Sequence, residues 1–285
     1  GAGGIGQNYP VTCADVPKNK YFDPVIRHNG TFVKTKGYCT DIFFKQALTW
    51  IKQSKDKPFF AYISTNAPHA PYIVADKYKD MYKDKCKSAK VAAFLGMITN
   101  IDDNMGLLTK KMDQWNLTNN TLLIFMTDNG TAAGCDLDGQ GFVNNGYNAG
   151  QRGKKGSEYD GGHRVPFLMH WPAGGYTESR DLNSLTANID FLPTLCDLCD
   201  IPISDDAMSH INGTSLKPLL EKDTQALDRV IVTDSQRVEH PEKWRKSATM
   251  TDRWRLINGK ELYDIQADPE QRNNVSAQNP DVMSN

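Results

Sequence analysis

The stretch IFMTDNG, residues 124–130, decides the fold. Its apolar start, with two leucines before it, is a short run typical of a buried strand. The run stops at Asp128-Asn129-Gly130, residue types that favour a turn because Asp and Asn bond to their own backbone and Gly accepts a positive φ. Asp128 and Asn129 also carry oxygen atoms of the kind that hard cations bind. The residues alone therefore leave a turn and a metal site as alternatives.

Strand and helix patterns alternate around this segment. Residues 58–64 and 165–171 are apolar runs that predict two further buried strands. Residues 89–112 have apolar side chains at helical spacing, and shorter helices are expected to begin near Thr40 and at Asp190. This alternation predicts an α/β domain with a mainly parallel sheet sandwiched by helices.

The pattern changes after about residue 225. Short strand candidates lie between residues 230 and 265, and Asn258-Gly259 is a typical hairpin turn. We therefore predict a small antiparallel sheet at the C-terminal end. The expected organisation is an α/β domain over residues 1–224 and an antiparallel subdomain over residues 225–285.

Composition excludes several classes of function. A net charge of −1 over 285 residues gives no basic surface for nucleic acid. No apolar run approaches the roughly 18 residues that predict a membrane span. Cys196 and Cys199 form a CxxC pair without a second ligand pair, so we expect packed core residues rather than a zinc site.

Three polar clusters follow or precede the predicted strands, where sites of α/β sheets form. They are the segment around His69, the turn at Asp128, and the loop over residues 152–164. Each has a structural interpretation: a rigid turn, a hairpin turn and a solvated lysine-rich surface. Together they supply oxygen ligands, a proton donor and fixed cations, a set that suits a divalent metal acting on an anionic ester.

Four motifs carry a family resemblance: TDNG at 127–130, NAPHAP at 66–71, GKKGSEYDGGHRVP at 153–166, and ELYDI at 261–265. They resemble the formylglycine-dependent type I sulfatases of the alkaline phosphatase superfamily, and most of all the bacterial arylsulfatase-like glycan sulfatases. The motifs occur in family order over nearly the whole chain. The resemblance implies an alkaline phosphatase-like fold, hydrolysis of an aryl sulfate or a sulfated carbohydrate, and a location in the periplasm, outside the cell or in the lysosome.

The resemblance also implies roles for single residues. Asp128 and Asn129 match Ca²⁺ ligands, and their oxygen atoms suit that ion. His69 matches the histidine that contacts the ester oxygen and protonates the leaving alcohol. Lys155 matches the lysine that grips the sulfate, because it alone falls in the family register.

The loop around Lys155 holds further candidates. Arg152, Lys154 and His163 are expected to line the substrate pocket. Asp160 and Arg164 are expected to be structural and to hold the loop on the sheet.

The family nucleophile is a formylglycine made from the Cys or Ser of a Cys/Ser-x-Pro-x-Arg motif. None of the six cysteines begins this pattern, and Cys13-Ala-Asp-Val-Pro has its proline in the wrong place. The paired aspartates that complete the calcium shell are missing as well. We therefore expect the C-terminal part of a sulfatase, with weak or absent Ca²⁺ binding and no turnover by this chain alone.

Two other interpretations stay open from the residues. One is a phosphoesterase of the same superfamily with a Thr or Ser nucleophile. The other is a non-catalytic, glycan-binding remnant.

Overall fold

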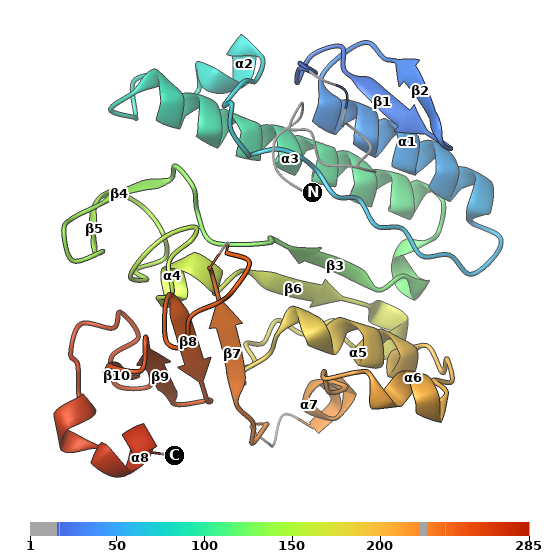
Figure 1. Ribbon diagram of the computed structural model, residues 1–285. Coiled ribbons are helices and arrows are strands. Elements are labelled where there is room, and N and C mark those ends of the chain that lie inside the picture. The colour runs from blue at the N-terminus through green and yellow to red at the C-terminus, as the bar shows by residue number, and fades with distance from the viewer. Residues whose placement is uncertain (1–15, 17, 223–226, 237, 285) are drawn as a thin grey trace. The chain divides into compact units, whose positions relative to one another are not determined.

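The computed structural model describes residue 16 and residues 18–222, 227–236 and 238–284 (Figure 1). Cys13 lies outside the described residues. The chain divides into two compact units. The first comprises Gly1–Leu123, Ala132–Gly134 and Trp171–Gly174, and the second comprises Ile124–Thr131, Cys135–His170 and Gly175–Asn285.

The first unit is built on two helices whose sequence periods predicted them. They are α1 (Cys39–Ser54) and α3 (Ala89–Gln114). Ser88 caps α3, because its side chain accepts a hydrogen bond from the backbone N–H of Val91 at 3.3 Å. Their apolar faces meet in a core made of Phe44, Leu48, Ile51, Leu108 and Met112.

Smaller elements complete the first unit. The short helix α2 (Asp76–Lys79) packs so closely on α3 that a Cβ at Gly96 would lie 3.0 Å from the backbone of Lys79. The others are an antiparallel hairpin and two single turns: β1 (Val25–His28), β2 (Thr31–Lys34), η1 (Thr118–Asn120) and η2 (Pro172–Gly174).

The prediction of a buried strand over residues 58–64 was wrong. This segment has no regular secondary structure, and Phe60 and Tyr62 are 74% and 78% exposed. The side chains of Phe59, Ala61 and Ile63 still pack against the core between α1 and α3. The segment alternates as an extended chain does, but no described strand pairs with it, and a strand requires that partner.

The second unit contains most of the strand predicted before Asp128. This strand, β3 (Leu123–Met126), pairs with β6 (Phe167–His170), and the ring of Phe167 packs edge-on against Phe191 at the start of α5 (Phe191–Leu198). The long connection between the strands holds an antiparallel hairpin and a helical turn: β4 (Cys135–Leu137), β5 (Val143–Gly146) and α4 (Asp160–His163). The other helical elements of the second unit before its C-terminal sheet are η3 (Asn188–Asp190), α6 (Asp205–Ser209) and α7 (Lys217–Lys222).

The predicted antiparallel C-terminal sheet is confirmed, and it lies within the second unit. Its strands run in the order β10-β9-β8-β7, with Asn258 and Gly259 at positive φ between β9 and β10. The strands and the short elements after them are β7 (Ile231–Asp234), β8 (Ser247–Met250), β9 (Trp254–Ile257), β10 (Glu261–Asp264), η4 (Ser276–Gln278) and α8 (Pro280–Ser284). The mixed α/β class is thus confirmed, whereas the domain boundary after residue 224 stays a prediction.

Two exclusions from the sequence can be compared with the described residues. No helix among them is long and apolar enough to cross a membrane. Cys196 is half-buried and Cys199 is exposed, both as free thiols. The expectation that both are packed in the core was therefore wrong for Cys199, because it lies beyond the last turn of α5.

Candidate functional site

The turn after β3 presents two oxygen-bearing side chains. Asn129 donates from Nδ2 to the carbonyl oxygen of Gly130 at 2.9 Å, which leaves its Oδ1 as an acceptor. Asp128 is exposed, and its carboxylate has no hydrogen bond or ion pair within the described part of the chain. Both oxygen groups are therefore available to a ligand.

Gly130 has a different role from the one expected of a turn glycine. Its φ is not positive; instead, a Cβ at this position would overlap the carbonyl oxygen of Gly161. The backbone N–H of Gly130 donates to the carbonyl of Gly162 at 3.0 Å. The glycine is needed because two backbone segments meet here.

The oxygen donors fit a hard cation in kind but not in number. Calcium takes about six to eight oxygen ligands. Asp128 and Asn129 supply two side-chain donors, and no group of three or more His, Cys, Asp or Glu side chains in the described ranges could hold a metal. The turn therefore provides at most part of a calcium shell.

Lys155 lies on the loop that meets this turn. Its backbone N–H donates to the carbonyl of Thr131 at 3.0 Å, so the loop is tied to the chain just after the turn. The ammonium of Lys154 lies 3.4 Å from the carbonyl oxygen of Cys135, whereas the ammonium of half-buried Lys155 has no partner among the described residues. The structure thus holds the backbone of Lys155 next to the turn of Asp128 and Asn129. It also distinguishes the two adjacent lysines, because only the ammonium of Lys154 has a partner among the described residues.

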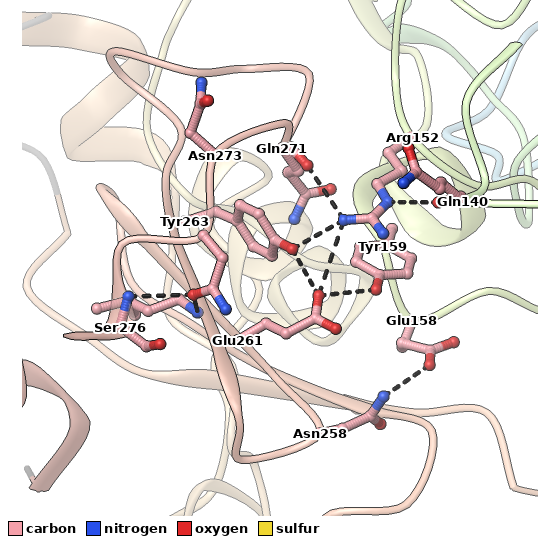
Figure 2. A network of polar contacts seen from close by, with 12 residues as sticks. Gln140, Arg152, Glu158, Tyr159, Asn258, Glu261, Tyr263, Gln271, Asn273 and Ser276 are labelled. Carbon is pink, nitrogen blue, oxygen red and sulfur yellow. Dashed lines mark hydrogen bonds and ion pairs between the residues drawn. The ribbon is translucent and has the colours of Figure 1, made fainter.

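Arg152 anchors the same loop to the C-terminal sheet (Figure 2). Its Nε donates to the carbonyl of Gln140 at 2.9 Å, and its Nη1 donates to the hydroxyl of Tyr263 at 2.8 Å. Nη1 also lies 3.7 Å from a carboxylate oxygen of Glu261, and the side chain is only 13% exposed. These contacts direct the guanidinium into the protein.

Two tyrosines close this network. The hydroxyls of Tyr159 and Tyr263 both donate to Oε2 of Glu261, at 2.8 and 2.5 Å. Burial, together with these hydrogen bonds to a carboxylate, raises the pKa of Tyr263 to about 12 and also raises the pKa of Tyr159. We define the Arg152 clasp as Arg152, Tyr159, Glu261 and Tyr263.

A second anchor is part of the helical turn α4. Asp160 is 1% exposed, accepts a hydrogen bond from Nε of Arg255 at 3.1 Å, and has its own N–H bound by the side chain of Gln271. Asp160 is therefore structural, as expected. Nε2 of His163 lies 3.1 Å from the carbonyl of Glu158, and burial lowers the pKa of its imidazole.

His69 lies in the first unit, between two cis X–Pro peptide bonds. Its Nδ1 is 2.7 Å from the carbonyl oxygen of Ala70, an atom that can accept a hydrogen bond but cannot donate one. This hydrogen bond assigns the proton of the neutral ring to Nδ1 and leaves Nε2 for a ligand. The hydroxyl of Tyr21 donates to the carbonyl of His69 at 2.6 Å and fixes the backbone of the turn.

The partners of Arg152 were not predicted from the sequence. Glu261 and Tyr263 belong to the ELYDI motif at 261–265, which pointed to these residues as part of the family pattern. The motif did not show that Tyr263 binds Arg152, which lies 111 residues earlier in the chain. The bidentate ion pair between Asp190 and Arg229, whose shorter bond is 2.6 Å, was not predicted either.

Comparison with known proteins gives matches to sulfatases. The Sulfatase family model matches residues 5–201, and the model described as N-sulphoglucosamine sulphohydrolase, C-terminal, matches residues 154–283. An N-acetylgalactosamine-6-O-sulfatase of Bacteroides thetaiotaomicron is 28% identical over 85% of this chain and 48% of its own length. An ulvan-active sulfatase of Formosa agariphila is 29% identical over 75% of this chain and 42% of its own length.

The fold leads to the same family. The crystal structure of Ps i-CgsB in complex with k-i-k-neocarrahexaose matches with a TM-score of 0.79 at 26% identity, covering 91% of this chain and 55% of that one. The chain thus spans about half the length of the proteins it resembles. Because one family model covers well over half of its residues, the chain belongs to the sulfatase family.

Proposed function

We propose that the whole protein hydrolyses sulfate esters of carbohydrates and that this chain supplies the sulfate-gripping cation and part of a calcium shell. One observation carries the proposal: backbone hydrogen bonds hold Lys155, whose ammonium has no described partner, against the turn that presents Asp128 and Asn129. An available cation next to hard oxygen donors suits an anionic ester.

The residues of the chain divide the chemistry among them. Lys155 binds the sulfate oxygens and stabilises the charge that grows on the group as the ester bond breaks. In the imidazolium form of His69, Nδ1 keeps its hydrogen bond to Ala70 and Nε2 gives its proton to the departing alcohol, which leaves the neutral Nδ1–H ring. The Arg152 clasp positions the Lys155 loop, and in this proposal Arg152 contacts protein groups rather than the sulfate.

Two groups outside these residues complete the proposal. Asp128 and Asn129 would hold Ca²⁺, which would neutralise part of the sulfate charge when bound. A formylglycine is expected as the nucleophile, and none of the cysteines of this chain begins the motif from which it is made. We therefore propose that the 285 residues have no sulfatase turnover by themselves.

A sulfated carbohydrate is the proposed substrate. The support comes from the relatives, which include an N-acetylgalactosamine-6-O-sulfatase and an ulvan-active sulfatase, and from a similar structure bound to a neocarrahexaose. From the family resemblance we place the protein outside the cytoplasm, in the periplasm, in the secreted space or in the lysosome. We also retain the division into an α/β domain over residues 1–224 and a small subdomain over residues 225–285.

Calorimetric titration of methyl galactoside 6-sulfate tests the proposal, with the unsulfated galactoside as the matched ligand. We expect a sulfate-dependent heat that strengthens when calcium is added, and we expect Asp128→Asn to remove this effect of calcium. Identical heats for the two galactosides would contradict sulfate recognition. A binding curve that neither calcium nor Asp128→Asn alters would contradict the metal assignment.

A further inference from the structure

A concave surface lies on the C-terminal sheet, and its lining contains none of the residues assigned above. It has a volume of about 390 Å³ and lies between β7, β8 and the segment over residues 241–244. We call it the Trp244 pocket. A volume of this size accommodates one sugar ring with its hydroxyl groups.

One wall of the Trp244 pocket is apolar and fixed in place. Trp244 and Val232 line it and are 42% and 63% exposed. The indole packs against Gly259, where a Cβ would come within 2.7 Å of the ring, so a larger residue would displace it. An exposed aromatic face that the protein already holds in position is suited to stacking on the C–H face of a sugar, because little ordering remains to be done on binding.

The lining of the pocket also carries hydrogen-bonding groups. Ser247 lines it, is 6% exposed, and has a buried Oγ that no described residue satisfies. Leaving such a hydroxyl without a partner is costly, and a ligand hydroxyl would satisfy it. Asp234 and Glu242 add carboxylate acceptors for further hydroxyl groups.

The pocket offers no excess positive charge to a sulfate. Asp234 and Glu242 line it together with Lys243, whose ammonium lies 5.2 Å from the centre of the Trp244 ring. Glu242 is also ion-paired with Arg245 at 3.3 Å, so the two carboxylates are matched by two cations. The pocket therefore suits an uncharged sugar, in contrast to the surroundings of Lys155, whose ammonium has no partner among the described residues.

Hydrogen bonds connect the pocket to the loop of Lys155. The hydroxyl of Ser235, next to Asp234, donates to the carbonyl of Gly156 at 3.4 Å. Asn258 accepts from the backbone N–H of Ser247 at 3.2 Å and donates to Glu158 at 2.8 Å. The pocket is thus connected to the loop of the proposed sulfate-binding lysine through Gly156 and Glu158.

We propose that the Trp244 pocket binds an unsulfated pyranose unit of the same oligosaccharide whose sulfated unit is bound at Lys155. The second half of this statement rests on the proposed function. The pocket itself is a site for a neutral sugar in either case.

Fluorine NMR of the full chain labelled with 5-fluorotryptophan tests the pocket, because it resolves the five tryptophans separately. The probes are methyl β-galactopyranoside and its 6-sulfate, and Trp244→Phe assigns the relevant signal. We expect the neutral galactoside to shift the Trp244 signal and to leave that of Trp50 unchanged; both side chains are 42% exposed. The sulfated probe should bind the pocket no more tightly than the neutral galactoside, because the cations around the pocket are balanced by carboxylates.

Ser247→Ala separates binding from folding. The hydroxyl has no described protein partner, so the variant should keep the stability of the chain. Its affinity for the neutral galactoside should fall about fivefold. No shift of Trp244 with the neutral sugar, tighter binding of the sulfated probe in the pocket, or unchanged affinity of Ser247→Ala would each overturn the proposal.

Lys155→Ala distinguishes the pocket from the proposed function. We expect it to leave the response of Trp244 to the neutral galactoside intact and to remove sulfate-dependent binding. If the neutral sugar shifts Trp244 while sulfate binding does not depend on Lys155, the pocket stands and the proposed function fails.

Discussion

The guanidinium carbon of Arg152 lies 3.9 Å from the centre of the Tyr159 ring, and both residues belong to the loop that carries Lys155. Because Tyr159 also donates to Glu261, this stacked pair connects the loop to the C-terminal sheet. A planar guanidinium can stack and donate several hydrogen bonds at once, which a lysine ammonium cannot reproduce. The position of Lys155 therefore depends on a residue that we do not expect to contact the substrate.

Arg152→Lys should destabilise the chain by about 2 kcal/mol, because the stacking and at least one hydrogen bond in a largely buried site are lost. Urea unfolding monitored by circular dichroism measures this change. Arg253→Lys is the matched control, since Arg253 also pairs with a carboxylate and stacks on an aromatic ring but is 54% exposed. A cost for Arg152→Lys no larger than that of the control would show that the clasp does not hold the loop.

Gly130→Ala should cost more than about 2 kcal/mol, because the added methyl group overlaps the carbonyl of Gly161 and separates the two loops of the site. Thermal unfolding provides the readout. Gly106→Ala in α3 has nothing within 4 Å of the new methyl group and should instead stabilise by about 0.5–1 kcal/mol. A tolerated Gly130→Ala would mean that the close approach of the loops is not required.

The stability of the chain should fall in acid partly through Asp190. Burial alone would raise the pKa of this carboxyl, but hydrogen bonds from Arg229 and from the backbone N–H groups of Thr214 and Ala187 overcome that effect and lower it. A lowered native pKa stabilises the fold above the unfolded value of about 3.9, and this contribution is lost as the pH falls below that value.

Urea midpoints between pH 6 and pH 3 measure this loss. Asp190→Asn should cost roughly 3 kcal/mol at neutral pH, since it leaves Arg229 without its buried partner, and should flatten the acid dependence. Asp56→Asn removes the partner of Lys55 at a carboxylate that is 82% exposed, and should leave the curve unchanged. An acid dependence that Asp190→Asn leaves as steep as before contradicts this account.

The neutral imidazole of His69 should carry its proton on Nδ1, as its hydrogen bond to Ala70 requires. Long-range proton–nitrogen NMR spectra distinguish the two tautomers. The exposed side chains of His28 and His240 serve as references without this constraint. A predominant Nε2–H form at His69 would show that Nε2 is not reserved for a ligand.

The sequence predicted elements whose pattern is local. The helices α1 and α3 follow from apolar spacing, and the hairpin at Asn258-Gly259 follows from its turn residues. The segment over residues 58–64 failed because its alternation is real but a strand also needs a neighbouring strand. No periodicity could reveal the contact of Gly130 with Gly161 or the clasp of Arg152 with Glu261, since each depends on how distant segments meet.

The family motif favours Lys155 over Lys154 by register, and the structure distinguishes the two lysines by their partners. Lys154 lies against the carbonyl of Cys135, whereas Lys155 has its ammonium available within the described residues. The central claim is that the second lysine alone grips the sulfate.

Calorimetric titration of galactose 6-sulfate onto Lys155→Ala and Lys154→Ala tests that claim most directly. We predict that Lys155→Ala weakens binding by at least about tenfold, the effect of removing one charge-assisted contact, while Lys154→Ala stays within about twofold of the unaltered chain. Equal affinities for the two variants, or a larger loss at Lys154, would contradict the account.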